Sequence, residues 1–320
     1  MKIIMGIDGG GSKTKTAIVD EKGNVLGEGL AGGSNYQTIG MEAAIHNLND
    51  SIQEALLSAK VKNNDITFVQ YALAGADRKI DFENLKEELA KLPFKNWDLV
   101  GDVLAGLRAG VEDGVGIAVV CGSGTNVVGR DKQGKLVQCG GHGYLYGDYA
   151  GGNIIATETF RAAIRSWEGR EVHSLLVDEV LSFFEYKSMD ELYEDFLNNQ
   201  ITRVPAGLTI GLHNAVERGD EIAKRILWEV GKELGTATNV VIRKMADFGV
   251  GGIPIVLIGS VFQGGNNSYL INAMEQTIKK SNVNYQLKTS ITDPVYGSVL
   301  LGMDALNIKM DQNFVNSFEM

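Results

Sequence analysis

Residues 8–14 read Asp-Gly-Gly-Gly-Ser-Lys-Thr, and this glycine loop joins two runs that are typical of β-strands. Residues 3–8 are mostly apolar and end in an acid, and residues 16–20 are rich in β-branched and apolar side chains. A turn follows at Lys22-Gly23-Asn24, and residues 25–30 then alternate. The N-terminus is therefore predicted to be a meander of antiparallel strands.

The loop at 8–14 offers backbone N–H groups without side-chain obstruction, an arrangement that binds anionic oxygens. A dinucleotide fingerprint or a P-loop needs a helix directly after the glycines. Because a strand follows here, we interpret the loop as a phosphate-binding β-hairpin. Asp8, at the strand end, can hold a hydrated Mg²⁺ beside the phosphates. The predicted nucleotide-binding residues of this loop are Gly10, Gly11, Ser12, Lys13 and Thr14.

The same order of elements returns further along the chain. An apolar run at 117–121 leads into the loop Gly122-Ser123-Gly124-Thr125, and a turn at 131–134 and a third run at 136–139 follow. Two copies of one unit predict two related domains that face each other, each offering a glycine hairpin with a hydroxyl. The alternative is that glycine hairpins occur in any β-protein.

The rest of the chain alternates between helix and strand signals. Helices are expected at 41–60, 82–92, 103–111, 153–167, 172–184, 189–198, 220–248 and 267–280, and strands at 68–73, 97–100 and 254–258. A third glycine loop, 259–265, is interpreted as a nucleoside cradle, with a simple strand-to-helix turn as the alternative. A final helix at 295–306 is expected to pack back on the first domain.

Length and composition exclude several classes of protein. A chain of 320 residues, 44% hydrophobic and 22% charged, suits two packed domains. The formal net charge of −10 argues against a nucleic-acid surface. Neither a signal peptide nor a membrane span is expected, which favours a cytoplasmic protein. Cys121 and Cys139 are interpreted as core thiols, and the scattered histidines argue against a zinc site.

The two hairpins and the third glycine loop, in this order, resemble the actin/hexokinase/Hsp70 superfamily. They are most similar to N-acetylglucosamine kinases of the BadF/BadG/BcrA/BcrD ATPase group. The motifs that carry the resemblance are Asp8 to Thr14, Ser34-Asn35, Leu73 to Asp77, Gly101 to Gly106, Gly122 to Asn126, Gly140 to Gly143, Gly147-Asp148 and Gly259-Ser260-Val261. The resemblance implies an α/β fold of two duplicated ribonuclease H-like (actin-like ATPase) domains with a cleft between them. We expect a first domain at 1–113 plus 296–320 and a nucleotide-binding domain at 114–295.

The activity implied by the resemblance is transfer of the γ-phosphate of ATP, with Mg²⁺, to the 6-hydroxyl of N-acetylglucosamine or a close N-acetyl amino sugar. Asp102, between an apolar strand and a helix, is then the general base, whereas the residues alone leave a helix N-cap as the alternative. The implied sugar-binding residues are Asn35, Gly75, Asp102, Gly124, Asn126, Gly141, His142 and Asp148. The further implied nucleotide-binding residues are Ser123, Ala206, Gly259 and Ser260.

Two positions depart from the family pattern. His142 stands where animal N-acetylglucosamine kinases carry Trp, and Ala74 where they carry Ser, which leaves the sugar open, N-acetylmuramic acid included. One alternative function is a BadF-type ATPase activator whose iron–sulfur cluster bridges two subunits through four cysteines. Another is a catalytically silent sugar or nucleotide sensor. The family often forms homodimers, but the sequence identifies no interface.

Overall fold

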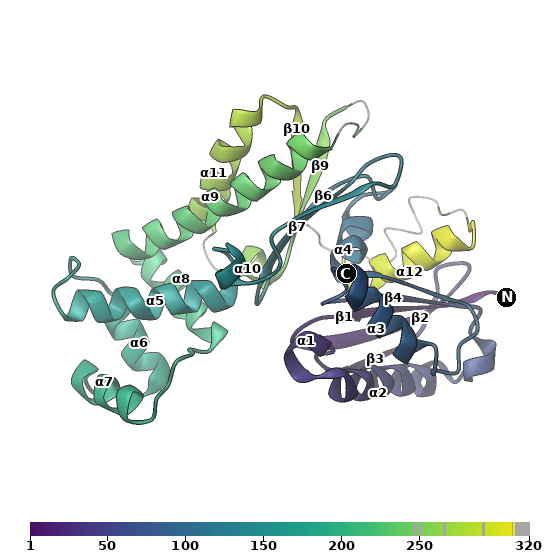
Figure 1. The fold of residues 1–320 in the computed structure, drawn as a ribbon, viewed down its shortest axis with the longest axis horizontal. Helices are drawn as coiled ribbons and strands as arrows, with labels where there is room; N and C mark the ends of the chain where they lie inside the picture. The colour runs from purple at the N-terminus through teal and green to yellow at the C-terminus, as the bar shows by residue number, and fades with distance from the viewer. Residues whose placement is uncertain (246–247, 249–250, 265–266, 290–291, 309, 311–320) are drawn as a thin grey trace.

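The structure is a computed structural model that describes residues 1–245, 248, 251–264, 267–289, 292–308 and 310. The described residues form two lobes, each built around a five-stranded sheet with helices packed against it (Figure 1). The second lobe carries a helical arm that reaches away from its sheet. In the described part of the chain, no helix combines the length and the apolar character that crossing a bilayer requires.

The first unit holds the predicted meander. Its strands are β1 (Ile3–Gly9), β2 (Lys13–Asp20), β3 (Val25–Gly32), β4 (Phe68–Leu73) and β5 (Trp97–Gly101), and its helices are α1 (Tyr36–Ile39), α2 (Met41–Ala59), α3 (Lys79–Leu89) and α4 (Asp102–Gly110), with a 3-10 turn at 63–65. β1 and β2 pair antiparallel up to Gly9 opposite Thr14. Leu48, Ile52 and Leu56 recur at helical spacing on α2 and are buried against this sheet.

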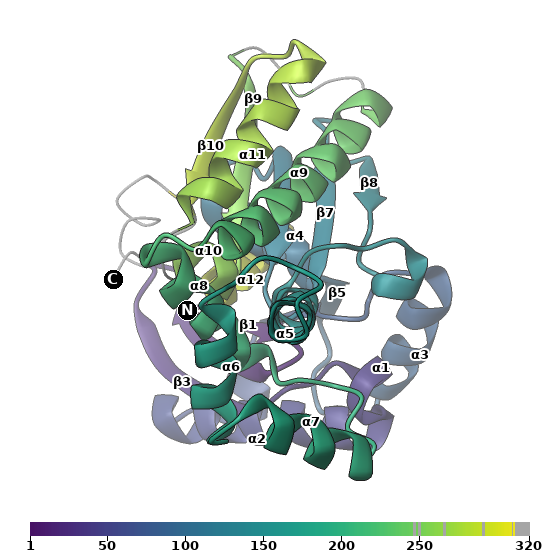
Figure 2. The ribbon, with the colours of Figure 1, turned by 90° about the vertical axis from the view of Figure 1, so that its left-hand side faces the viewer.

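The second unit repeats the strands and adds more helices. Its strands are β6 (Gly116–Cys121), β7 (Thr125–Arg130), β8 (Leu136–Cys139), β9 (Ile253–Ile258) and β10 (Tyr285–Thr289). Its helices are α5 (Gly152–Trp167), α6 (Leu176–Phe184), α7 (Met189–Asn198), α8 (Thr209–Glu217), α9 (Glu221–Lys244), α10 (Ser260–Gln263), α11 (Ser268–Ile278) and α12 (Pro294–Ala305), with 3-10 turns at 144–146, 206–208 and 279–281. The helices α5 to α8 make up the arm, and Figure 2 views α5 end-on.

The two sheets have the same strand order. The first runs β3-β2-β1-β4-β5, and the second, taken from its β8 edge, runs β8-β7-β6-β9-β10. In both, the first three strands are antiparallel neighbours and the last two pair in parallel. The predicted repeat is therefore confirmed, and it extends beyond the hairpins to all five strands.

The helix that follows the fifth strand of each unit packs on the sheet of the other unit. After β5, α4 buries Val103 and Leu107 in a cluster with Val256 of the second sheet. After β10, α12 buries Val299 in a cluster with Ile4 of the first sheet. This exchange of helices links the two hydrophobic cores.

The two exchanged helices also cross in direct contact. A Cβ built on Gly297 of α12 would lie 1.9 Å from the carbonyl oxygen of Ala105 in α4, so only glycine permits this approach. Nearby, the buried Arg108 of α4 forms two hydrogen bonds with the Asp304 carboxylate of α12, at 2.8 and 3.2 Å. The lobes are thus joined by packed helices rather than by a flexible linker.

Several sequence expectations differ from the structure in detail. The segment expected as a loop at 259–265 contains α10, which begins at Ser260 directly after Gly259. Its last residue, Gly265, lies outside the described residues. The helix expected from 172 begins at Leu176, and the helix expected to reach 248 ends at Lys244. The domain boundaries stay a prediction, and residues 309 and 311–320 of the first domain lie outside the described residues.

Candidate active site

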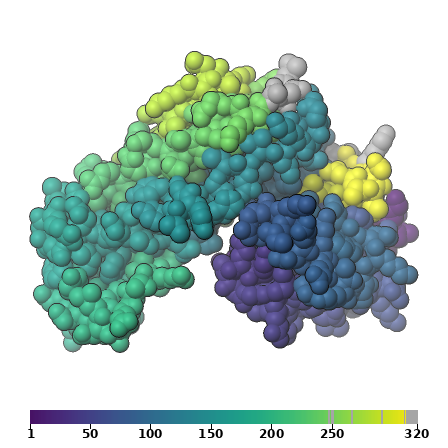
Figure 3. All heavy atoms as spheres, viewed as in Figure 1, coloured from purple at the N-terminus to yellow at the C-terminus, as the bar shows by residue number. Residues whose placement is uncertain are grey.

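A cleft of about 670 Å³ lies between the two units. Figure 3 shows the surface hollowed between the purple and blue atoms of the first lobe and the teal and green atoms of the second. The predicted site residues that line this cleft are Asp8, Gly10, Gly11, Ser12, Lys13, Asn35, Gly75, Asp102, Ser123, Gly124, Asn126, Gly141, Gly259 and Ser260. The fold therefore brings both glycine hairpins, the start of α4 and the third glycine segment to one place.

The two glycine hairpins face each other across the cleft. Each is closed by a backbone hydrogen bond of 2.9 Å within its own loop. A Cβ built on Gly11 of the first hairpin would lie 3.6 Å from Oγ of Ser123 in the second. Gly259 packs on the base of the second hairpin, where an added Cβ would lie 2.4 Å from the carbonyl oxygen of Cys121. Backbone donors from both units can therefore reach one anionic group.

Four carboxylates, Asp8, Asp77, Asp102 and Asp293, line the cleft. Burial raises the pKa of Asp8 to about 8, and the negative charges of Asp102 and Asp293 add to this effect. Burial also raises the pKa of Asp102 to about 6, with a contribution from Asp77, although the Val103 N–H donates to Asp102 Oδ1 at 2.9 Å. A cation or a hydrogen-bond donor brought by a ligand would relieve this excess of negative charge.

Asp293 is a cleft residue that the sequence analysis missed. It occupies the N-cap position of α12, and Asp102 stands at the corresponding end of α4 as its first helical residue. Lys15 holds Asp293 at 3.2 Å and Glu28 at 2.8 Å. The Tyr296 hydroxyl donates to the same Glu28 carboxylate at 2.8 Å. Lys15 and Asp293 lie 278 positions apart, so no local pattern could have revealed the pair.

A polar wall lies on the first-unit side of the cleft. Asn35 caps α1, where its side-chain oxygen accepts the N–H of Gln37 at 3.0 Å. The Gln37 amide in turn donates to the carbonyl oxygen of Gly75 at 3.2 Å. Gly75 has φ +83°, a conformation that glycine adopts without strain. These bonds fix the edge of the cleft that faces β7 and β8.

Asp77, in the first unit, forms hydrogen bonds with two residues of the second unit. It is another site residue that the sequence analysis missed. Its Oδ1 accepts hydrogen bonds from Nε2 of Gln138 at 3.2 Å and from Nδ2 of Asn126 at 3.4 Å. Burial raises the pKa of Asp77, while the Gln138 hydrogen bond and the nearby His142 oppose the rise. Asp77 therefore ties the two lobes together at the mouth of the cleft.

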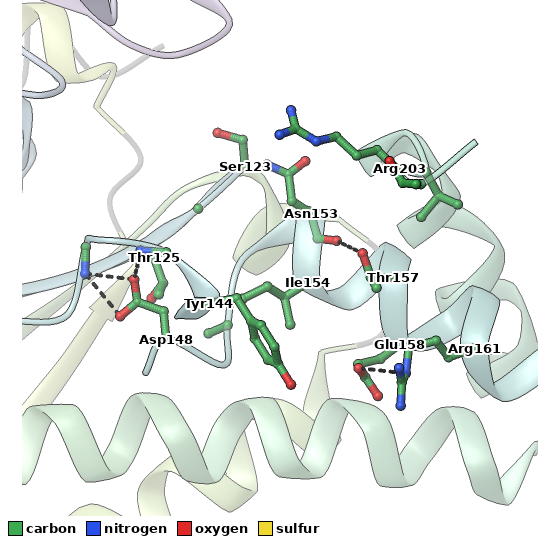
Figure 4. Close-up of a pocket in the computed structure, with 16 residues that line it drawn as sticks. Ser123, Thr125, Tyr144, Asp148, Asn153, Ile154, Thr157, Glu158, Arg161 and Arg203 are labelled. Carbon is green, nitrogen blue, oxygen red and sulfur yellow. Dashed lines mark hydrogen bonds and ion pairs between the residues drawn. The ribbon is translucent and has the colours of Figure 1, made fainter. Parts of the chain in front are cut away.

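A second cavity, of about 510 Å³, lies on the other side of the second hairpin (Figure 4). Ser123 and Arg203 lie on one side of it, with Asn153 of α5 between them. Arg203 forms no ion pair or hydrogen bond with another described residue, which makes it a cation available to a ligand. The predicted nucleotide residue Ala206 lies next to Gly152, whose added Cβ would be 3.6 Å from its side chain.

Four predicted residues do not line the cleft. Ala206 is one of them. Thr14 is buried, and its hydroxyl donates to a β3 carbonyl oxygen at 2.8 Å. His142 is exposed and lines neither cavity. Asp148 lines the second cavity, where its carboxylate accepts the N–H groups of Gly141 and Gly143 and shapes the loop between β8 and α5.

Comparison with known proteins gives this site a family context. The model of the BadF/BadG/BcrA/BcrD ATPase family matches residues 5–302. The chain belongs to this family. An N-acetylmuramic acid/N-acetylglucosamine kinase of Clostridium acetobutylicum is 28% identical over 303 residues, which is 94% of this chain and 98% of the relative. An N-acetyl-D-glucosamine kinase of Dictyostelium discoideum is 25% identical over 319 residues, covering 95% of this chain and 98% of the relative.

Solved structures share the fold of this BadF/BadG/BcrA/BcrD family member. A candidate N-acetylglucosamine kinase from Chromobacterium violaceum superposes with a TM-score of 0.73 at 20% identity, covering 94% of this chain and 99% of that one. A ROK family glucokinase from Streptomyces griseus, solved with glucose and AMPPNP, gives a TM-score of 0.60 at 13% identity, covering 94% and 98%. The predicted fold class, two duplicated actin-like units, is thereby confirmed.

Proposed function

We propose that this protein is an ATP-dependent sugar kinase. It transfers the γ-phosphate to the 6-hydroxyl of N-acetylglucosamine or of a close N-acetyl amino sugar, N-acetylmuramic acid included. The observation that carries the proposal is the meeting of two glycine hairpins beside Asp102 in one cleft. The kinases of Clostridium acetobutylicum and Dictyostelium discoideum, which match along nearly their whole length, support the class of sugar.

The hairpins hold the phosphates, and Asp102 accepts the proton. Backbone N–H groups of both loops donate to phosphate oxygens, and Lys13 adds a positive charge. The sugar 6-oxygen forms a bond to the γ-phosphorus while its proton passes to the Asp102 carboxylate. The bond from that phosphorus to the β–γ bridging oxygen breaks, and ADP leaves. A pKa of about 6 keeps Asp102 mostly ionised at neutral pH and still basic enough to share a proton.

The cleft also suits Mg²⁺ held through water. The charges of Asp102 and Asp293 around Asp8 create the excess that a divalent cation would balance, and carboxylate oxygens are the ligands it prefers. Within the described residues, no three metal-ligating side chains are grouped closely enough to bind a metal directly, which favours a hydrated ion beside Asp8. When bound, Mg²⁺ would neutralise charge on the phosphates.

The cysteines do not favour the alternative of an iron–sulfur activator. Cys121 is buried, and burial raises the pKa of its thiol to about 12, whereas cluster ligation needs a thiolate. Cys139 is partly buried in β8, and burial also raises its pKa. Neither side chain is presented at a surface tip where two subunits could share a cluster.

A coupled assay of ADP release tests the proposal. Purified protein with MgATP is given N-acetylglucosamine, N-acetylmuramic acid, N-acetylmannosamine, glucosamine and glucose in turn, with Asp102→Asn as the matched control. We expect sugar-dependent ADP release with the N-acetyl sugars from the wild type and a large loss in the variant. Release that no sugar raises above the sugar-free rate would overturn the kinase and favour a sensor.

A further inference from the structure

We propose that Asp77 is a positioning residue for substrate recognition. Its carboxylate holds the Asn126 amide so that Asn126 Oδ1 faces the cleft as a hydrogen-bond acceptor. The site then selects a ligand that presents an N–H or O–H donor at that point. This inference rests on the proposed function for the class of ligand, and it adds how the site distinguishes one ligand from another.

The direction of the Asn126 amide follows from what an ionised carboxylate can do. Asp77 Oδ1 receives Nδ2 of Asn126 at 3.4 Å and Nε2 of Gln138 at 3.2 Å. An ionised carboxylate only accepts hydrogen bonds, so both amides must turn their NH₂ groups toward it. The Gln138 NH₂ is fixed a second time, because it also donates to the carbonyl oxygen of Gly140 at 3.1 Å.

Gly141 also packs against the Asn126 amide. Gly141 has φ +94°, and a Cβ built there would lie 2.8 Å from Asn126 Cγ and 2.9 Å from its Nδ2. The glycine backbone therefore packs directly on the amide group. With Gly141 packed against it and its NH₂ engaged by Asp77, the amide has one favoured orientation.

The oxygen end of this amide lacks a partner. Asn126 Oδ1 is buried and accepts no hydrogen bond within the described residues. A buried acceptor without a donor is energetically costly. The residue lines the same cleft as Asn35, Gly75 and Asp102, and we infer that a ligand bound there supplies the missing donor. A sugar hydroxyl or an acetamido N–H has this chemistry.

The selectivity follows from the unpaired acceptor. A site built to hydrogen-bond a substrate O–H or N–H strongly rejects the analogue that lacks it, because the acceptor then stays unpaired. If Asp77 were neutral and able to donate, Asn126 could turn round and offer its NH₂ instead. Removing the charge of Asp77 should therefore weaken the preference for donors more than it weakens phosphoryl transfer.

The test compares wild type with Asp77→Asn on N-acetylglucosamine and its 3-deoxy and 4-deoxy analogues, and on glucose and 2-deoxyglucose, which differ only in the hydroxyl donor at C2. Calorimetry without ATP gives the Kd of each sugar, and the kinase assay gives KM and kcat. For the wild type, we expect one deoxy analogue to bind roughly 5–150-fold more weakly than the sugar that keeps the donor, a ratio of Kd values that we call the analogue penalty. That analogue identifies the donor that faces Asn126.

In Asp77→Asn, we expect this penalty to fall to a few-fold, KM for N-acetylglucosamine to rise roughly tenfold, and kcat to stay within about threefold. Asp98→Asn makes the same chemical change at an exposed position of β5 and is the matched control; its penalty should equal that of the wild type. In an Asn126→Ser background, Asp77→Asn should change the penalty no further. That lack of additivity is a readout that a purely structural role of Asp77 would not produce.

The outcomes separate the inference from the proposed function. Wild-type turnover combined with a full analogue penalty in Asp77→Asn overturns the role of Asp77 alone. Wild-type binding and turnover without a penalty for any analogue also overturns it, because no donor is then selected. If the wild type neither binds nor phosphorylates any of the sugars, both proposals fall. Should Asp77→Asn not fold, a full analogue penalty in Asn126→Ser overturns the inference, because Asn126 would then not be the acceptor that selects the donor.

Discussion

The first and second units share five strands in one order, yet their hairpins carry different chemistry. In each hairpin, the strand pair nearest the loop is followed by a second pair of facing residues. This second pair is Asp8 with Lys15 in the first unit and Val120 with Asn126 in the second. The first unit thus has two charged side chains at this pair, with Asp8 lining the cleft, whereas the second has an apolar side chain and a neutral amide, both lining it. The same five-stranded scaffold therefore carries charged side chains at this position in the first unit and a neutral hydrogen-bonding side chain in the second.

The starts of the exchanged helices differ in the same way. Asp293 of the second unit is bound by Lys15, whereas Asp102 of the first forms no ion pair within the described residues. The carboxylate of Asp102 is open to a substrate proton, whereas the carboxylate of Asp293 is already engaged by Lys15. Corresponding ends of the two helices therefore offer different chemistry, and this difference can be measured.

The largest expected effect separates these two carboxylates. Asp102→Asn should lower kcat by roughly 10²–10⁴-fold, the usual contribution of a general base. Asp293→Asn changes the carboxylate at the start of α12 and should lower kcat by no more than about tenfold, because it disturbs a salt bridge and one charge near Asp8 but leaves the base in place. Steady-state kinetics on both variants, with folding checked by circular dichroism, decide the matter. Equal losses would mean that Asp102 has no special role.

The pH dependence of kcat/KM should report the ionisation of Asp102. Because the pKa of Asp102 is raised to about 6, its ionised form is lost as pH falls through that value. We expect kcat/KM to be level near neutral pH and to fall about tenfold per pH unit below about 6. Asp102→Asn should lack this acidic limb. A wild-type profile that stays flat down to about pH 5 would assign the proton to another group.

The two units should also differ in how they hold nucleotide charge. Lys13 lies in the first hairpin, whereas the second hairpin has no basic residue, and Arg203 lines the cavity that Ser123 of this hairpin also lines. We expect Lys13→Ala to raise the Kd of MgATP by about 10–100-fold. Arg203→Ala should raise it by only about 3–10-fold, with a larger effect at low salt. Isothermal titration calorimetry at two salt concentrations measures both. An unchanged Kd in Arg203→Ala would remove the second cavity from nucleotide binding.

The smallest effect is one of stability. Burial raises the folded-state pKa of Asp8 from 3.8 to about 8, so the folded protein binds this proton more tightly than the unfolded chain does. The resulting stability is present at low pH and is lost as pH rises from about 4 to 8. Asp8→Asn removes this loss, so its Tm should exceed that of the metal-free wild type by about 2 °C or more at about pH 8.5 and by less at about pH 5. Differential scanning calorimetry with EDTA gives both values, and a gain that does not grow with pH would contradict the shift. The same variant should lose most of its kinase activity.

Much of the fold followed from local patterns in the sequence. Residues 3–8 and 117–121 predict buried strands, and the glycines after them predict hairpins, because these signals depend only on neighbouring residues. The strand β10 was missed since its side chains at the sheet edge are mostly exposed, with Gln286, Lys288 and Thr289 among them. The helix α8 was missed in a stretch where a 3-10 turn at 206–208 runs directly into it.

Only part of the candidate site could be predicted from the sequence, for a related reason. Asp8, Ser123 and Gly259 lie in glycine loops whose composition signals ligand contact, and the cleft gathers all three. Asp293 lies in a sequence without such a signal, and Asp77 ends the motif Leu73 to Asp77, in which only Gly75 was predicted as a site residue. Their positions depend on contacts with Asn126, Gln138 and Lys15, which come from distant parts of the chain. Side chains whose neighbours are set by tertiary packing cannot be identified from a single sequence.

The crossing of α4 and α12 has a consequence for anyone who cuts this chain. A fragment that ends after residue 113 would keep α4 but lose the apolar surface it covers, and it would leave the outer face of β1 and β2 bare where α12 belongs. The remaining fragment would keep α12 without the first sheet that it covers, and its own sheet would lack α4. Neither half should be stable by itself, and the two expressed together should reassemble by fragment complementation.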